Sequence, residues 1–337
     1  MTTPKRRPPV MADVAKEAGV SHQTVSRVLN DHPNVRADTR ARVEEAITRL
    51  GYRRNLVARA LVTKRSRTLG VVSFDTTLYG PASTIYGIEQ AARTAGYFVS
   101  IVSLKSIDLA NVREAIDYLA EQGVDGVVVV APQRSAGRAL ENLPAGLPAV
   151  AVEGTHSAEV SVVCIDQIEG ARLATRHLLQ QGHETVWHVS GPSDWLETEG
   201  RIEGWRSALE EAGRPVPEPL AGDWSPRAGY EAGKSLAEMS GVTAVFTAND
   251  QMALGVLRAL SEKGVRVPDQ ISVVGFDDIP ESAFFSPPLT TVRQDFDVVG
   301  RHCIEVLLRQ IDSGPTAYER LVVRPSFVVR SSTAPAR

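Results

Sequence analysis

His22, Gln23, Ser26 and Arg27 are polar residues at a spacing that places them on one face of a short helix. Glutamine and arginine side chains can form paired hydrogen bonds with the edges of adenine and guanine in the DNA major groove. A small helix pair with a solvated face would show the same polar residues, so the pattern alone leaves both interpretations open. The neighbouring sequence favours the DNA-binding interpretation.

The segment 11–30 predicts two short helices joined by a tight turn, and each helix has an apolar face. Gly19 supplies the turn after the first helix, and Ser21 is a suitable N-cap for the second. The apolar positions are Val14, Ala15 and Ala18 in the first helix and Val25, Val28 and Leu29 in the second. This layout is typical of a helix-turn-helix whose second helix contacts the major groove.

A third helix is predicted over 39–50, and its apolar face consists of Val43, Ala46, Ile47 and Leu50. The segment 55–63 could form about two further helical turns, which is too short a helix to be stable alone in water. It would form only against another surface, such as the same segment of a second copy together with the DNA minor groove.

The charge of the chain is divided unevenly along its length. Residues 1–67 hold 15 Lys+Arg and 6 Asp+Glu, whereas the remainder holds 22 and 34, although the net charge is only −3. A basic segment on an acidic body is typical of a DNA-binding domain attached to a separate module. Residues 1–9 are expected to be a disordered basic arm, which either contacts DNA phosphates or is a solvated tail.

From Thr68 onward, apolar strands alternate with amphipathic helices, which predicts parallel sheets covered on both faces. The expected strands lie at 69–74, 98–103, 126–130, 149–152, 160–165, 186–190, 244–247 and 271–276. The expected helices include 83–95, 109–122, 168–181, 199–212, 227–239 and 250–263. These are too many strands for one small sheet, so we expect two doubly wound sub-domains with a cleft between them.

In such sheets, ligands bind beyond the carboxyl ends of the strands. Asp75, Asn249 and Asp277 follow predicted strands, and Arg201 lies near a helix start, where a cation needs a partner. Trp224 offers a flat apolar face in a loop. Carboxylate, amide and guanidinium groups beside an aromatic ring are suited to a sugar, because they bind its hydroxyls and cover its C–H face.

These polar residues also have structural interpretations. Asp250 is better explained as the N-cap of the helix that follows it than as a ligand residue. Asp277 could be a loop carboxylate with local partners, and Trp224 could cover the core at its rim.

Residues 14–21, Val-Ala-Lys-Glu-Ala-Gly-Val-Ser, and 24–30, Thr-Val-Ser-Arg-Val-Leu-Asn, resemble the signature of the LacI/GalR repressor family. The later Leu-Gly-Tyr at 50–52 and the Asn, Ala and Leu that follow it extend the resemblance. It implies that His22, Gln23 and Arg27 contact bases, and that Leu61 wedges between base steps with Ala58 against the same groove. We expect DNA contacts from Ser21, His22, Gln23, Thr24, Ser26, Arg27, Asn30, Asn55, Ala58 and Leu61.

The resemblance extends through the body, where it implies a periplasmic-binding-protein-like fold with three crossovers, near 165, 294 and 324. It implies ligand contacts from Arg201, Asn249, Asp277 and Trp224, and cleft positions for Gln294, Phe296 and, less directly, Glu169. Phe74 and Glu197 replace serines of a galactoside-responsive family member, so a different sugar could be favoured. The expected ligand residues are Phe74, Asp75, Glu169, Glu197, Arg201, Trp224, Asn249, Asp277, Gln294 and Phe296.

The expected architecture is an all-α helix-turn-helix head and hinge helix joined to an α/β body of two doubly wound parallel-sheet sub-domains. The head spans 10–54, the hinge 55–67 and the body 68–337. Within the body, one sub-domain comprises about 68–165 and 295–324, and the other about 166–294 and 325–331. No leucine heptads follow the last strand-like segment, 320–329, so we expect a homodimer rather than a tetramer.

The expected function is repression of transcription from a palindromic DNA operator, relieved by a small, galactoside-like carbohydrate effector. The alternatives are a repressor of the same family that needs a co-repressor, and a sugar-binding module without a regulatory role. We find no nucleophile elbow, metal cluster or phosphate-binding glycine loop, so we expect neither an enzyme nor a cofactor.

The sequence also carries signals about location. It has no secretory signal and no apolar run long enough to cross a bilayer. Cys164 and Cys303 are far apart in the chain and match no metal-binding spacing. We therefore expect a cytoplasmic protein without a membrane partner.

Overall fold

The computed structural model describes residues 7–53, 65–104, 109–130, 133, 143–144, 146–153, 160–314 and 317–336. The chain divides into an N-terminal unit, Met1–Ser66, and a body, Arg67–Arg337. The predicted hinge contacts Asn55, Ala58 and Leu61 lie outside the described residues.

The N-terminal unit consists of α1 (Met11–Ala18), α2 (His22–Leu29) and α3 (Ala37–Leu50) around a small shared core. Gly19 and Gly51 end α1 and α3 in the left-handed conformation, with φ of 64° and 63°, which glycine adopts without strain. Ser21 begins α2, and its Oγ accepts the Thr24 N–H at 3.1 Å. The predicted helix-turn-helix is thereby confirmed.

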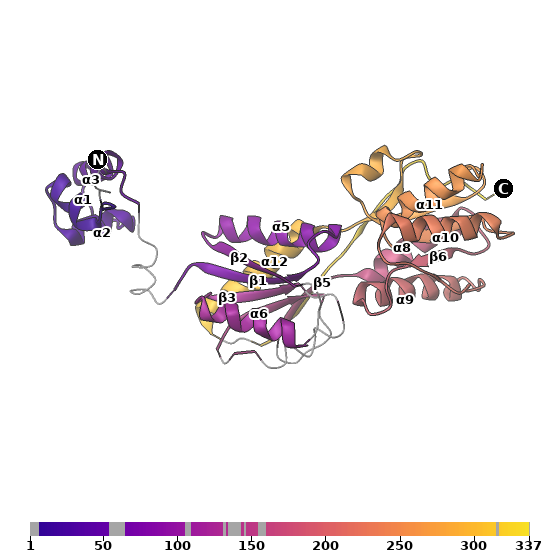
Figure 1. Cartoon of the computed structure of the whole chain (residues 1–337), viewed down its shortest axis with the longest axis horizontal. Coiled ribbons are helices and arrows are strands. Elements are labelled where there is room, and N and C mark those ends of the chain that lie inside the picture. The colour runs from indigo at the N-terminus through magenta and orange to yellow at the C-terminus, as the bar shows by residue number, and fades with distance from the viewer. Residues whose placement is uncertain are drawn as a thin grey trace, which may run out of the picture. The chain divides into compact units, whose positions relative to one another are not determined.

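The body contains two six-stranded sheets, which define a first and a second lobe (Figure 1). The first lobe is all parallel, in the order β11-β5-β4-β3-β1-β2. Its strands are β1 (Thr68–Phe74), β2 (Phe98–Leu104), β3 (Gly126–Val130), β4 (Ala149–Val152), β5 (Ser161–Ile165) and β11 (Arg320–Val323). The strands β3, β4 and β5 are buried throughout, as expected for a parallel sheet covered on both faces.

The second lobe has the strand order β12-β10-β9-β8-β6-β7, in which only β12 runs antiparallel to its neighbour. Its strands are β6 (Trp187–Ser190), β7 (Leu220–Ala221), β8 (Ala244–Thr247), β9 (Ser272–Asp277), β10 (Thr290–Arg293) and β12 (Ser326–Val328). The strand-like stretch 320–329 is thus two strands in different sheets, separated at Pro325, which has no N–H to donate to a ladder.

Helices cover both faces of each sheet, so the predicted α/β body with two doubly wound lobes is confirmed (Figure 1). In the first lobe, α5 (Tyr79–Thr94) and α12 (Phe296–Ser313) pack on one face and α6 (Leu109–Glu121) on the other. In the second lobe, one face carries α8 (Gln167–Gln180) and α9 (Leu196–Glu211), and the other carries α10 (Pro226–Glu238) and α11 (Asp250–Glu262). A short 3₁₀ helix, η1 (Pro280–Phe284), follows β9.

Paired helices approach each other closely at glycines. A Cβ on Gly300 of α12 would lie 2.2 Å from the carbonyl carbon of Gly87 in α5. A Cβ on Gly255 of α11 would lie 1.9 Å from the Pro226 carbonyl oxygen of α10. The backbones therefore touch where larger side chains would separate the helices.

The chain passes between the lobes at three points: from β5 to α8, from β10 to α12, and from β11 to β12. Each lobe therefore contains segments from distant parts of the sequence. Among the described residues, no helix is long and apolar enough to cross a membrane.

Candidate functional site

The first candidate site is the exposed side of α2 in the N-terminal unit. The side chains of His22, Gln23 and Arg27 are solvent-exposed there, and none of them forms a hydrogen bond or ion pair with another residue in the described ranges. The buried side of the same helix is anchored by Val25 and Val28. The helix therefore presents unengaged donors and acceptors on a fixed support.

Other predicted DNA contacts on α2 have structural partners. The Ser21 and Thr24 hydroxyls lie 2.9 Å apart at the start of the helix. Asn30 ends the helix and donates from Nδ2 to the Ser26 carbonyl at 2.9 Å. These side chains shape the ends of the helix, and they lie on either side of the exposed residues described above.

The second candidate site is a cavity of about 270 Å³ between the lobes of the body. Its volume is close to the lower end of the range for small-molecule sites, roughly 300–1,000 Å³. The cavity is lined by Glu197, Arg201, Trp224, Asn249, Asp277, Gln294 and Phe296 from the predicted set. The structure thus brings together residues more than 90 positions apart in the sequence, by placing strand ends and helix starts at one opening.

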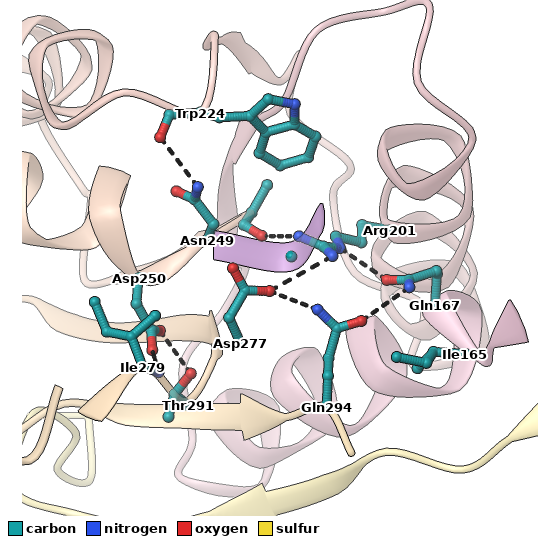
Figure 2. Close-up of polar contacts among 12 residues, drawn as sticks. Ile165, Gln167, Arg201, Trp224, Asn249, Asp250, Asp277, Ile279, Thr291 and Gln294 are labelled. Atoms are coloured by element: carbon teal, nitrogen blue, oxygen red, sulfur yellow. Dashed lines mark hydrogen bonds and ion pairs between the residues drawn. The ribbon is translucent and has the colours of Figure 1, made fainter. Parts of the chain in front are cut away.

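Four buried side chains form a closed ring of polar contacts in this cavity (Figure 2). Arg201 Nε donates to Gln167 Oε1 at 3.0 Å, and Gln167 Nε2 donates to Gln294 Oε1 at 3.0 Å. Gln294 Nε2 donates to Asp277 Oδ1 at 2.6 Å, and Arg201 Nη2 lies 3.7 Å from the same oxygen. Each side chain fixes the next, so the ring holds its polar groups in one geometry.

Burial and charge determine the protonation of this ring. Burial raises the pKa of Asp277 to about 6, although the Arg201 charge and the Gln294 hydrogen bond both oppose the shift. Burial also lowers the pKa of Arg201, against the opposing effect of Asp277, Glu197 and Glu153. The Arg201 guanidinium lies 3.9 Å from the centre of the Phe276 ring, which packs beneath it.

Two indoles form an aromatic wall of the cavity. Trp195 and Trp224 pack edge to face with ring centres 5.4 Å apart, and both line the cavity. Asn249, the N-cap of α11, donates from Nδ2 to the Trp224 carbonyl at 3.0 Å and accepts the Met252 N–H at 2.8 Å. Its amide therefore fixes the loop that carries Trp224.

Strained backbone gathers around the cavity. Glu153, Trp224 and Asp277 all line it and have φ of 55°, 72° and 109°, in the region that favours glycine. Such conformations persist where the surrounding structure enforces them and are frequent at binding sites.

The cavity wall also contains buried polar atoms without partners. Glu197 Oε2, Trp224 Nε1 and Gln251 Oε1 are buried and form no hydrogen bond with any described residue. Buried polar groups are nearly always paired, so these atoms offer an acceptor, a donor and an acceptor to a ligand.

Three predicted ligand residues do not line the cavity. Phe74 instead packs against Trp195, with ring centres 6.3 Å apart, and against the cores of both lobes. The Asp75 carboxylate accepts bonds from the Thr77 N–H and hydroxyl, which close a local turn. Glu169 lies in the first turn of α8 outside the lining residues.

The structural interpretation of Asp250 was wrong in its detail. Asn249 is the N-cap, and Asp250 is a fully buried first residue of α11. Its carboxylate accepts the Thr291 hydroxyl at 2.6 Å and the Ile279 N–H at 2.9 Å (Figure 2). Asp250 therefore ties α11 to β10 and to the loop after β9.

The predicted set omits many residues that line the cavity, among them Glu153, Gln167 and Trp195. Glu153 follows β4, Gln167 begins α8 just after β5, and Trp195 is the N-cap of α9. The rule that selected Asp75 and Asp277, a polar residue just beyond a strand, would also have selected Glu153 and Gln167. Within the described ranges, no cluster of three or more His, Cys, Asp or Glu side chains could hold a metal ion.

Comparison with known proteins identifies both units. Residues 10–55 match the model of bacterial regulatory proteins of the lacI family, and residues 175–333 match a periplasmic binding protein-like domain. The lactose operon repressor of Escherichia coli (strain K12) is 33% identical over 332 residues, which cover 97% of this chain and 91% of the repressor. A crystal structure of the lac repressor dimer bound to operator and the anti-inducer ONPF matches with a TM-score of 0.87 and 32% identity, covering 97% of this chain and 100% of that one.

Other similar proteins are regulators with different names. The transcriptional repressor PurR of Haemophilus influenzae is 35% identical over 330 residues, covering 95% of this chain and 97% of the relative. The structure of a complex of the transcriptional regulator CelR with cellobiose matches with a TM-score of 0.72 and 33% identity, covering 96% and 99% of the two chains. Since relatives above 30% identity span nearly the whole chain, this protein belongs to the lacI family of bacterial regulatory proteins.

Proposed function

We propose that this protein is a transcriptional repressor that binds a palindromic operator as a homodimer and leaves it when a small carbohydrate enters the cavity. The observation that carries the proposal is the ring of Arg201, Gln167, Gln294 and Asp277. It lies beside two indoles and polar atoms that have no hydrogen-bond partner among the described residues. Fixed polar groups beside flat aromatic faces bind a polyhydroxylated ring, whose edges carry hydroxyls and whose faces carry C–H groups. As a repressor, it would act in the cytoplasm, where bacterial DNA lies.

The DNA side of the proposal rests on the exposed side of α2. His22, Gln23 and Arg27 would contact base edges, and Ser21 and Thr24 would approach the adjacent backbone. A two-fold dimer matches a palindromic site, because each copy supplies one reading helix to one half-site. The lac repressor is such a dimer on its operator, and it is similar to this chain over nearly its whole length.

The hinge adds a second expected contact. By family resemblance, Leu61 would wedge between base steps at the operator centre, with Ala58 and Asn55 beside it. We expect Leu61→Ala to weaken operator binding more than non-specific binding in a titration of both DNAs. Equal losses on both would contradict the wedge.

The cavity lies between lobes that are joined at three crossovers, so a ligand contacts both lobes at once. A ligand that fits one lobe arrangement better than the other shifts the equilibrium between them. Effector and operator would then oppose each other through one coupling free energy, typically about 1–3 kcal/mol.

In a second candidate function, the ligand strengthens operator binding instead of weakening it. PurR of Haemophilus influenzae is named as a repressor and is 35% identical to this chain, whereas the lactose operon repressor is 33% identical. A co-repressor mechanism, in which the ligand strengthens DNA binding, would use the same cavity. The direction of the ligand effect on operator affinity distinguishes the two mechanisms.

The test begins with selection of operator DNA from a random duplex library by the purified protein. Fluorescence anisotropy then measures operator affinity with and without a panel of mono- and disaccharides, and thermal shift reports their binding. We expect a palindromic site and at least one sugar that weakens binding, with Arg27→Ala as the variant that loses the specific site. A protein that selects no palindrome, or whose operator affinity no sugar weakens, would contradict the proposal.

A further inference from the structure

The cavity contains more negative than positive groups. Among the described residues that line it, Arg201 is the only cationic side chain, whereas Glu153, Glu197 and Asp277 are carboxylates. Asp250, buried behind the wall, also acts on the Arg201 charge. A single guanidinium therefore faces an excess of carboxylates in a buried space.

Arg201 is already committed to partners within the protein. Its Nε donates to Gln167, its Nη1 donates to the Ala248 carbonyl, and its Nη2 lies 3.7 Å from Asp277 Oδ1. All three of its nitrogens are thereby directed toward the ring and toward the segment between β8 and α11. Neither Arg201 nor any other cation among the described residues forms an ion pair with Glu153 or Glu197.

Glu197 is the less satisfied of these two carboxylates. It lies in the first turn of α9, and its Oε2 is buried at the cavity wall without a hydrogen-bond partner in the described ranges. Burial and then repulsion from the Glu153 charge raise the pKa of Glu197 well above its ordinary value. Glu153 therefore lies close enough to Glu197 to oppose its ionisation, and burial raises the pKa of Glu153 as well.

Glu153 is held in place by one oxygen. Its Oε1 accepts the Ile165 N–H at 2.8 Å and lies 3.3 Å from Gln167 Nε2, so this oxygen is anchored to the start of α8. No hydrogen bond to its second oxygen connects it to the described residues, and the side chain lines the cavity. One carboxylate from each lobe thus faces the ligand space.

We propose that the effector is a cationic carbohydrate, an amino sugar or imino sugar whose ammonium group binds between Glu153 and Glu197. An ammonium supplies several N–H donors and a positive charge to two carboxylates that form no ion pair with the described residues, one of which has an unpaired oxygen, Glu197 Oε2. The indoles of Trp195 and Trp224 line the same cavity and attract cations through their faces. A neutral sugar would offer the buried Glu197 Oε2 only an uncharged hydrogen bond, which is weaker than one from an ammonium.

This inference rests on the proposed function, because it names the class of effector for the same cavity. The test measures binding by calorimetry and operator release by anisotropy for matched sets of sugars at pH 6.5. The cationic probes are glucosamine, galactosamine and the imino sugars 1-deoxynojirimycin and 1-deoxygalactonojirimycin. The neutral probes are the N-acetyl derivatives of the two amino sugars, glucose and galactose. Acetylation is the sharpest comparison, because it removes the charge and keeps the nitrogen.

We expect at least one cationic probe to bind roughly tenfold or more tightly than its neutral counterparts and to release the operator. Glu197→Gln should remove that preference while leaving the affinity for neutral sugars within about twofold, since the amide keeps the shape and loses the charge. Glu153→Gln, which retains an oxygen for the Ile165 N–H, should act in the same direction. Glu203→Gln is the matched control, because Glu203 is exposed on the same helix away from the cavity.

The outcomes separate the two proposals. If neutral sugars release the operator and no cationic probe exceeds its counterparts, the inference is wrong and the proposed function stands. If a cationic probe binds tightly but Glu197→Gln and Glu153→Gln keep its preference, the assigned carboxylates are wrong. If no compound binds or changes operator affinity, both proposals fail together.

Discussion

Replacement of Arg201 by methionine tests the buried ring directly. The Arg201 and Asp277 side chains are only 5% and 8% exposed, and their charged atoms lie 3.7 Å apart. At an effective dielectric constant of about 20, this attraction is on the order of 4 kcal/mol. Arg201→Met leaves the buried Asp277 carboxylate without its cation, so we expect a loss of about 3–5 kcal/mol in the free energy of unfolding of the body.

The double variant Arg201→Met/Asp277→Asn removes both charges and should recover much of that loss. Thermal and urea unfolding of the full chain would measure both, with a fall in Tm on the order of 10 °C for the single variant. Arg206→Met is the control, because Arg206 is exposed on the same helix and should change stability by less than about 0.5 kcal/mol. A coupling energy below about 1 kcal/mol in this double-mutant cycle would refute the ion-pair argument.

The same variant separates effector response from DNA binding. Arg201 lies in the body and the reading helix in the N-terminal unit, so the folded variant should bind operator with unchanged affinity. Without Arg201 the ring loses its charged hydrogen bond to Gln167, worth about 1.5–3 kcal/mol, and with it the fixed geometry of the site. The sugar concentration that releases the operator should therefore rise at least tenfold. Release of a folded Arg201→Met variant at ordinary sugar concentrations would remove Arg201 from the site.

Three further perturbations follow from the geometry. Ser21→Ala removes the acceptor of the Thr24 N–H, so α2 should lose about 1 kcal/mol, and hydrogen exchange at the Thr24 amide should accelerate; an unchanged rate would contradict the cap. Gly300→Ala should destabilise the first lobe by at least about 1–3 kcal/mol in urea unfolding, because its Cβ would meet the Gly87 backbone; wild-type stability would show that the helices can separate. The raised pKa of Asp277, about 6, means that the wild type loses stability relative to Asp277→Asn as pH rises from 5 to 7.5. That relative loss should be roughly 1–2 kcal/mol in unfolding titrations, and a difference independent of pH would contradict the shift.

The alternation of apolar strands and amphipathic helices was enough to predict the layers of the body, because parallel strands are buried on both faces. It was not enough to divide 320–329 between two sheets. Both halves are strand-like locally. The crossover near 324 was expected only from the family resemblance, and the structure assigns Arg320–Val323 to the first lobe and Ser326–Val328 to the second.

For the cavity, the position of a residue beyond a strand end predicted which residues would be near it, but not where their side chains point. Asp277 points into the ring, whereas Phe74, also at a strand end, packs sideways on Trp195. The direction of each side chain depends on the backbone conformation after the strand and on how the two lobes pack together. Neither can be predicted from a local sequence pattern. The role of Glu197 depends in addition on the hydrogen-bond partner that its Oε2 lacks among the described residues.

The three crossovers have a consequence for how this chain acquires its structure. The core of the first lobe joins Leu69 and Ile88 to Val299, Leu307 and Val323, so its packing needs segments from both ends of the body. During synthesis, β1 to β5 would emerge from the ribosome long before α12 and β11 could cover and complete their sheet. Because contacts so distant in sequence form slowly, the nascent first lobe would expose apolar strands while the second lobe is made. Chaperone protection should therefore matter most in that interval, and a chain truncated before residue 296 should aggregate rather than yield one folded lobe.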